Sequence, residues 1–457
     1  MTIKNYSFIA SLIIFFFTVL FMINYDPMIN IFHYTFSIKY YNYYCYFGLD
    51  GITIFFLLLT SFFIPLCILF SWNNKFVYIK EYYISILSLE ILLYIIFTTL
   101  DLLLFYIFFE AILIPFFILI GIYGSRFRKI HASYMLFFYT IAGSILMLFS
   151  IIYIYIHTGT LNLQLLWNME FNNILSKFLW FSFFLSFSVK VPIFPFHIWL
   201  PEAHVEAPTE ASVILAAILL KVGIYGFLRI LIPIFPSLTF YYLNLIILLN
   251  IISLFYTSLI TLRQIDIKKI IAYSSISHMN VCVIGVLSFQ IHSIAGSMLL
   301  MFGHGFVSGA LFFLIGVLYD RYKTKLIFYY SGLAHSMPLF SSIFFFFILS
   351  NISMPCTSNF IGEFLILYGI VSQYNILVII FISMSIFICT IYSIWLYNKI
   401  IFGLPNYNFI FITKDLTKNE FMLFIPIIIG TFTLGIYPKL FLDIFLFNIY
   451  YYFNFII

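Results

Sequence analysis

Six ionisable side chains fall near the centres of long apolar segments of the sequence. They are Glu110, Lys190, Lys221, His278, His304 and Glu363. A charged side chain at the centre of a bilayer costs about 2.5–3.5 kcal/mol or more unless it is paired or hydrated, so such residues usually have a function. A lone histidine in this position could equally be a packed residue whose polar atoms are satisfied. Six such groups in one chain favour proton transfer over packing for the set as a whole.

Lysine and glutamate could together form a proton switch. Burial disfavours the charged form of each, whereas a nearby opposite charge favours it, so a partner that moves can change which form is held. We predict that Glu110 pairs with Lys190 when the proton site is closed. Separation of the pair would make Lys190 release its proton toward Lys221.

Imidazole and carboxyl groups would complete the path. Histidine titrates near neutral pH, so His278 and His304 could pass a proton on through bound water. Glu363 would be the terminal carrier. Glu90 and Asp101 are weaker candidates, because Glu90 has no obvious partner and Asp101 lies at an expected helix junction.

A metal or redox site is not expected in this chain. The segment 202–210 carries four polar side chains that could bind a metal: Glu202, His204, Glu206 and Glu210. Their spacing lacks a closed ligand set, so we predict a hydrated loop or entrance there. The five cysteines are far apart and show no paired spacing: Cys45, Cys67, Cys282, Cys356 and Cys389. We therefore expect neither an iron-sulfur nor a zinc centre.

The elements that position these residues must be membrane helices. The chain has 457 residues, of which 64% are hydrophobic and 8% are charged, and its mean hydropathy is +1.13. Such a chain needs lipid as its solvent. Its long apolar runs match helices of roughly 20 residues rather than barrel strands of roughly 10. We therefore predict an all-α polytopic membrane protein.

Apolar runs between polar residues predict about thirteen transmembrane helices. The expected ranges are 7–24, 51–72, 82–98, 99–121, 131–156, 174–200, 210–232, 240–262, 268–289, 292–318, 337–372, 376–402 and 421–437. The tail 440–457 could be a further span or could lie in the membrane interface.

Two of these helices should be discontinuous. The first is interrupted at Pro192 and the second near Pro355. They are the sixth and the eleventh helices, which suggests a five-helix unit used twice, with the second copy inverted. The predicted organisation is N-terminal helices, two five-helix repeats, and a C-terminal helix and tail, at 1–81, 82–232, 240–402 and 403–457.

Basic residues support this helix count. Lys and Arg gather in alternate loops, among them those that hold Lys268 and Lys325, as expected for the side of the membrane that retains positive charge. The opposite side would hold only Lys39, Lys177, Arg229 and Lys439. The 62 Phe and 36 Tyr fit an AT-rich organellar genome, and no Arg-rich transit peptide precedes the first apolar run. We expect the chain to be made inside the organelle.

Several motifs resemble those of the antiporter-like subunits of respiratory complex I. The longest is SVKVPIFPFHIWLPEAHVEAPTEASVILAAILLKVGIYGFLR, from Ser188 to Arg229. The others are FYIFFEAILIP, DIKKIIAYSSISHMN, MFGHGFVSGALFFLIG and MPCTSNFIGEF. EAPTEAS after the broken helix, combined with a glutamate in NFIGEF, is similar to one branch of that family rather than to its paralogues.

The resemblance implies a function as well as a fold. It implies that the same six residues form the proton pathway, and that NADH oxidation and ubiquinone reduction occur elsewhere in the complex. NADH, FMN, iron-sulfur clusters and ubiquinone would belong to other subunits, with no cofactor in this chain. Expected partners are membrane-arm subunits on both sides, accessory subunits and lipids of the mitochondrial inner membrane, without nucleic acid. The family usually has fourteen helices, so one could hide in the Tyr-rich segment 31–47.

Other functions stay open at this stage. A subunit of a multisubunit Na⁺/H⁺ antiporter would share the lysines and the broken helices. A structural membrane-arm subunit would hold its buried charges as static pairs. A solute transporter is disfavoured, because no segment indicates a substrate pocket.

Overall fold

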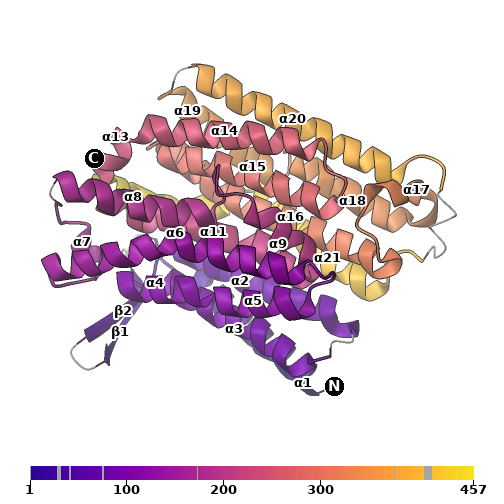
Figure 1. The fold of residues 1–457 in the computed structure, drawn as a ribbon, viewed down its shortest axis with the longest axis horizontal. Helices are drawn as coiled ribbons and strands as arrows, with labels where there is room; N and C mark the ends of the chain where they lie inside the picture. Colours follow the sequence, from indigo (N-terminus) through magenta and orange to yellow (C-terminus); the bar gives the residue numbers. More distant parts are fainter. Residues whose placement is uncertain are drawn as a thin grey trace. The chain divides into compact units, whose positions relative to one another are not determined.

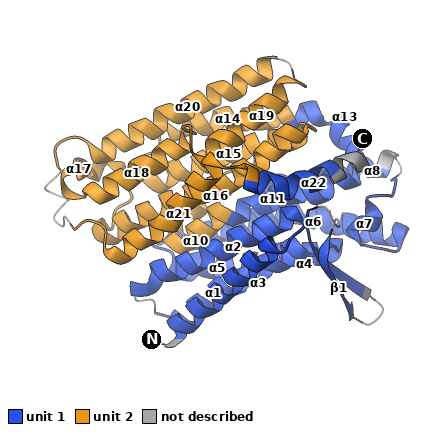
Figure 2. Cartoon of the chain, turned by 180° about the vertical axis from the view of Figure 1, so that it is seen from behind, with its two compact units in different colours: residues 1–192, 218–246, 440–457 blue, residues 193–217, 247–439 orange. Residues whose placement is uncertain are grey.

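The structure is a computed structural model, and it describes residues 2–27, 32–40, 43–74, 77–171, 173–374, 376–405 and 414–456. Most of these residues are helical (Figure 1). The chain divides into two compact units, shown in Figure 2, which are interleaved along the sequence. Unit 1 comprises residues 1–192, 218–246 and 440–457, and unit 2 comprises residues 193–217 and 247–439.

Unit 1 contains both ends of the chain and a β-hairpin. Its elements are α1 (Thr2–Ile23), β1 (His33–Tyr40), β2 (Tyr43–Leu49), α2 (Gly51–Phe70), η1 (Ser71–Asn73), α3 (Ile79–Thr98), α4 (Leu102–Ala111), α5 (Leu113–Tyr123), α6 (Lys129–Thr158), α7 (Leu163–Leu166), α8 (Asn173–Lys190), α11 (Leu220–Gly226), η3 (Phe227–Leu231), α12 (Ile232–Ile234), α13 (Pro236–Tyr241) and α22 (Lys439–Ile456).

Unit 2 is formed by the second half of the chain and by the segment after the first helix break. Its elements are α9 (Trp199–Glu206), α10 (Thr209–Ile214), α15 (Ile267–Leu287), α16 (Ile291–Tyr322), η4 (Ile327–Tyr329), α17 (Leu333–Ser336), α18 (Pro338–Asn351), α19 (Ser358–Val371), α20 (Ile376–Ile401) and α21 (Lys418–Ile436). The chain crosses between the units within η2 (Leu215–Leu219) and α14 (Leu243–Thr261).

The predicted fold class is confirmed. Among the described residues, eleven helices are long and apolar enough to cross a membrane. The remaining predicted segments are the two broken ones, which are helical on both sides of each break. α8 ends at Lys190 and α9 begins at Trp199, while α18 ends at Asn351 and α19 begins at Ser358. The division into inverted five-helix repeats stays a prediction.

The N-terminal segment differs from one expectation. The described part of the Tyr-rich segment 31–47 forms the antiparallel hairpin of β1 and β2, with Tyr40 opposite Tyr43, so the extra helix is not there. The C-terminal tail forms α22 instead. Phe55 of α2 has its ring centre 5.5 Å from those of both Phe441 and Phe445. This packing makes the last helix part of unit 1.

Proline accounts for an interruption between α4 and α5. Pro115 has no N–H to donate to the carbonyl of Ala111, and its ring crowds that carbonyl. The helix is accordingly irregular at Ile112, which separates α4 from α5 within one apolar span. Glu110 is the penultimate residue of α4 and therefore lies directly before the irregular turn.

Small residues allow two close helix contacts. A Cβ atom added to Gly226 would overlap the Phe187 ring of α8, lying 2.6 Å from its Cδ1 atom. A Cβ atom added to Gly362 of α19 would lie 2.7 Å from the backbone nitrogen of Leu300 in α16. Small side chains let membrane helices approach closely, where packing replaces the hydrophobic effect. Each contact places a helix that carries a predicted site residue.

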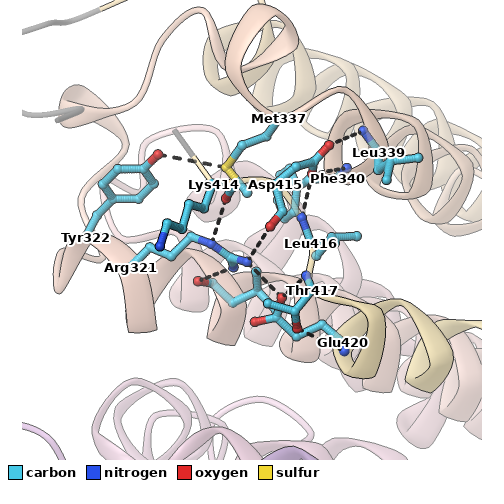
Figure 3. Close-up of polar contacts among 11 residues, drawn as sticks. Arg321, Tyr322, Met337, Leu339, Phe340, Lys414, Asp415, Leu416, Thr417 and Glu420 are labelled. Carbon is cyan, nitrogen blue, oxygen red and sulfur yellow. Dashed lines mark hydrogen bonds and ion pairs between the residues drawn. The ribbon is translucent and has the colours of Figure 1, made fainter. Parts of the chain in front are cut away.

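A polar cluster around Arg321 connects three helix ends in unit 2 (Figure 3). The Arg321 guanidinium donates to the carbonyl oxygens of Lys414 and Asp415, at 3.0 Å each, and to Glu420 Oε2 at 2.7 Å. The Asp415 carboxylate accepts from the backbone N–H groups of Leu339 and Phe340 at the start of α18. The end of α16 is thus joined to the starts of α18 and α21.

Candidate functional site

Lys190 and Glu110 are neighbours in unit 1 without a direct bond. Lys190 ends α8, is 2% exposed, and donates from Nζ to the carbonyl oxygen of Phe109 at 3.1 Å. Its ammonium group lies 4.2 Å from the centre of the Phe109 ring. Glu110 follows Phe109 and lies close enough to interact electrostatically with Lys190, beside Ser144 of α6.

Within the part of the chain that the structure describes, no ion pair joins Lys190 to Glu110. The ammonium group is held instead by a backbone carbonyl and an aromatic face, both from the residue that precedes the glutamate. Pairing and separation of these groups stay a prediction.

Lys221 is the second buried lysine of unit 1. It lies in α11 and is 0% exposed. π-helical turns flank α11 on both sides, at 215–219 and 227–231. Single π-turns within α-helices occur often at functional sites, because they free backbone groups and reorient side chains. Lys221 is therefore on an irregular helix, which contacts α8 through Gly226.

His278, His304 and Glu363 come together in unit 2. His278 Nδ1 lies 3.1 Å from Glu363 Oε1, which joins α15 to α19. The ring centres of His278 and His304 are 5.6 Å apart, which brings in α16. His304 is 1% exposed, and the other two residues are 5% exposed. Three residues that are distant in sequence thus form one buried titratable cluster.

Two further members of this cluster were not predicted from the sequence. Cys389 and Tyr392 lie one turn apart on α20, both buried. The Cys389 sulfur is 3.8 Å from His278 Nε2, and it accepts a hydrogen bond of 2.9 Å from the Tyr392 hydroxyl. The sequence offered no signal for them, because a cysteine and a tyrosine on an apolar helix normally pack without a polar role.

Comparisons with known proteins agree with these observations. Residues 99–389 match the family described as NADH:quinone oxidoreductase/Mrp antiporter, TM. The NADH-ubiquinone oxidoreductase chain 4 of Arabidopsis thaliana is 51% identical over 437 residues, which covers 95% of this chain and 88% of the plant protein. That of Chondrus crispus is 48% identical over 443 residues, covering 96% and 90%. The chain belongs to the NADH-ubiquinone oxidoreductase chain 4 family.

Solved structures agree with membership of the chain 4 family. A chain of respiratory complex I from Thermus thermophilus with bound NADH has a TM-score of 0.90 and 26% identity, covering 99% of this chain and 95% of that chain. A chain of the Mrp complex from Dietzia sp. has a TM-score of 0.87 at 18% identity, covering 99% and 93%. The second likeness concerns the fold alone. The branch indicated by EAPTEAS and NFIGEF is thus chain 4.

One buried ion pair of this chain 4 family member was not predicted. The sequence places Arg229 near the end of the helix 210–232, on the side of the membrane with few basic residues; in the structure it lies in η3, is 2% exposed and pairs with Asp50. Asp50 also caps α2 by accepting from the N–H of Thr53 at 2.8 Å. The pattern of Asp50 followed three residues later by Thr53 resembles a capping box and could have indicated a buried start of α2.

Two lysines that were expected in loops are buried as well. Lys268 of α15 and Lys325, which follows α16, are each 1% exposed. Lys268 Nζ donates to the Ala207 carbonyl oxygen at 3.0 Å, and Lys325 Nζ donates to that of Val205. Cations are favoured at a helix C-terminus, where carbonyl groups lack partners. The two lysines therefore hold the end of α9.

The acidic segment beside them is helical, which corrects the predicted loop. Glu202, His204 and Glu206 belong to α9, and Glu210 belongs to α10. Only Glu202 is partly exposed, and it pairs with Lys269 at 2.6 Å. The other three side chains are 0% or 1% exposed. The prediction of a loop is wrong, because two short helices, α9 and α10, cover almost all of this polar segment.

Proposed function

We propose that this chain translocates protons as a membrane-arm subunit of complex I. NADH oxidation and quinone reduction would occur in other subunits, and the energy would reach this chain through changes in conformation and charge. Family membership supports this role, since the relatives are subunits of NADH-ubiquinone oxidoreductase. Its place would be the mitochondrial inner membrane, with other complex I subunits as partners and no redox group of its own.

The observation that carries the proposal is the burial of Lys190 at the end of α8. An ammonium group buried in a membrane helix is costly, and at this position it ends the helix beside the break. Since a backbone carbonyl rather than an anion holds it, a change in the position of Glu110 alters its charge environment directly. In this proposal, Lys190 takes a proton when Glu110 approaches and gives it toward Lys221 when Glu110 withdraws.

The cluster in unit 2 would form the later part of the path. His278 can take a proton on one ring nitrogen and release one from the other. Its contact with Glu363 supplies an adjacent carboxyl group, and His304 lies close enough for transfer through one bound water. Glu363 would be the terminal carrier.

The test compares Lys190→Ala with Lys177→Ala, which removes an exposed lysine from the same helix. Both variants are assembled into complex I in inner-membrane vesicles, and NADH oxidation and proton uptake are measured together. Loss of a positioned proton carrier should slow NADH-driven proton translocation by about tenfold or more. Lys177→Ala should leave the rate unchanged. Normal translocation by Lys190→Ala at normal complex content would favour the structural reading, in which the buried charges are static.

A second measurement separates complex I from a cation antiporter. Native membranes are solubilised gently, and the NADH-oxidising band of a native gel is analysed for this chain by mass spectrometry. Co-migration is expected from the family assignment. Absence from that band, together with sodium-dependent proton movement that does not need NADH, would support the antiporter instead.

A further inference from the structure

A buried carboxyl group in unit 1 has no role in the path described above. Glu90 is the twelfth of the 20 residues of α3 and is 1% exposed. Neither carboxyl oxygen has a hydrogen-bond partner among the described residues. No Lys, Arg or His lies within ion-pair distance of it in this part of the chain.

Hydroxyl groups from three helices lie around Tyr94, one turn from Glu90. Tyr94 is one turn further along the same face of α3, close enough to interact with it electrostatically. The Tyr94 hydroxyl adjoins Thr60 and Ser61 of α2 and Thr18 of α1. Thr18 Oγ1 and Ser61 Oγ are 2.8 Å apart in a buried hydrogen bond. Tyr94 thus interacts with Glu90 and also lies next to a hydrogen-bonded pair of hydroxyl groups, although the helices are largely apolar.

This environment can hold both forms of a carboxyl group. An ionised carboxylate without a counter-charge is costly away from water, so the neutral acid is the form that burial favours. A hydroxyl can accept the acid proton, and after a small side-chain rotation it can donate to the carboxylate. A carboxyl group that reaches a hydroxyl by such a rotation can exchange a proton with it without a metal or a fixed cation.

We propose that Glu90 is a proton-binding site of the α1–α3 helices, separate from the six residues of the main path. During turnover Glu90 binds a proton on its carboxyl group and releases it toward Tyr94 and the hydroxyl groups beside it. The proposal rests on the proton-translocating function proposed above, and it adds a carrier in the N-terminal helices. The ligand is the proton itself.

The first test uses the native complex and a hydrophobic carbodiimide. This reagent reacts with protonated carboxyl groups in apolar surroundings, and peptide mass spectrometry locates the adduct. We expect an adduct on Glu90 and none on Glu81, an exposed carboxylate in the first turn of the same helix. If Glu90 stays unmodified under conditions that modify another intramembrane carboxyl group, the proposal is wrong.

The second test compares Glu90→Gln with Glu81→Gln in the assembled complex. Glu90→Gln keeps the size and polarity of the side chain but cannot release a proton, so we expect the number of protons moved per NADH to fall. Glu81→Gln should match the unmodified complex. An unchanged proton number in Glu90→Gln would overturn the proposal. The proposed function is tested separately by Lys190→Ala. If that function is wrong, Lys190→Ala would translocate protons at the normal rate.

Discussion

The imidazole of His278 contacts a different side chain at each ring nitrogen. Nδ1 faces Glu363 on α19, and Nε2 faces Cys389 on α20. Contacts on both sides restrict the orientation of the ring, and that orientation decides which nitrogen can take a proton from which neighbour. The geometry of this one residue therefore depends on three helices.

The pairing of His278 with Glu363 should be visible as non-additive mutational effects. Removing one member of a buried pair leaves the other uncompensated, which costs about 3–5 kcal/mol, whereas removing both costs less. We expect the double variant His278→Gln/Glu363→Gln to resist heat better than Glu363→Gln alone. The measurement is the temperature at which the chain leaves the complex on a native gel. Purely additive losses would contradict a direct pair.

Cys389 should matter through its sulfur and not through its volume. Cys389→Val would remove the acceptor of the buried Tyr392 hydroxyl, and an unsatisfied buried donor costs about 1–3 kcal/mol. Cys389→Ser keeps an acceptor and should cost less. Heat stability of the assembled complex, with the translocation rate, compares the two. A valine variant as stable as the serine variant would show that the contact is incidental.

At the level of elements, the close approach of α11 to α8 depends on a missing side chain. Gly226→Ala would place a methyl group 2.6 Å from Cδ1 of the Phe187 ring and in overlap with that ring, and overpacking of this kind costs about 1–3 kcal/mol. Gly121→Ala is the control, since its nearest neighbour, Ser133 Oγ, would be 3.6 Å away. We expect Gly226→Ala alone to lower the inactivation temperature and the rate of proton translocation. Equal behaviour of the two variants would contradict the proposed contact.

The Arg321 cluster joins elements that are distant in sequence. Arg321→Lys keeps the charge but replaces a fork of five donors with a single ammonium group, so several acceptors in Figure 3 lose their partner. We expect a loss of about 1–2 kcal/mol in the stability of the assembled complex. Lys323→Ala breaks an exposed pair with Asp320 at 3.7 Å and should cost much less. Chemical denaturation of the purified complex compares the two.

The helices could be predicted well from the sequence, whereas the polar contacts could not. Apolar periodicity and length located each membrane segment, and Pro192 and Pro355 marked the two broken ones. The roles of Arg229 and Lys268 were misjudged, because a basic residue at the end of an apolar run fits a loop equally well. Only tertiary structure brings Asp50 to Arg229, which is 179 residues away.

For the site, the unusual residues could likewise be predicted from the sequence, whereas most of their contacts could not. His278 and Glu363 were chosen because ionisable groups are rare in apolar helices, and the structure places them side by side. The role of Cys389 could not be inferred, since its chemistry here comes from its neighbours and not from its type. Composition thus indicates which residues are unusual, and packing determines which of them meet.

At the level of the whole molecule, neither compact unit is a continuous stretch of the chain. Unit 1 includes α22, although unit 2 intervenes in the sequence. A Cβ atom on Gly51 would lie 2.9 Å from Asn448 Nδ2, so α22 packs directly on the start of α2. Asn448 also donates to the Tyr25 hydroxyl at 2.9 Å.

Gly51→Val should therefore act like the loss of α22. The added side chain would push the last helix away from α2, so we expect less assembled complex and a lower inactivation temperature. Deletion of residues 439–457 should give the same defect, with no further loss when the two changes are combined. An additive loss in the combined variant would mean that Gly51→Val acts elsewhere.

The position of α22 has a consequence for how the protein is made. A ribosome delivers α1 to α8 into the membrane early, yet the face of α2 that contacts α22 stays uncovered by it until the last residues emerge. During that time an insertion factor or an assembly chaperone could shield the apolar surface of Phe55 that Phe441 and Phe445 later cover. A premature stop codon near the end of the gene would thus damage the helices that were synthesised first.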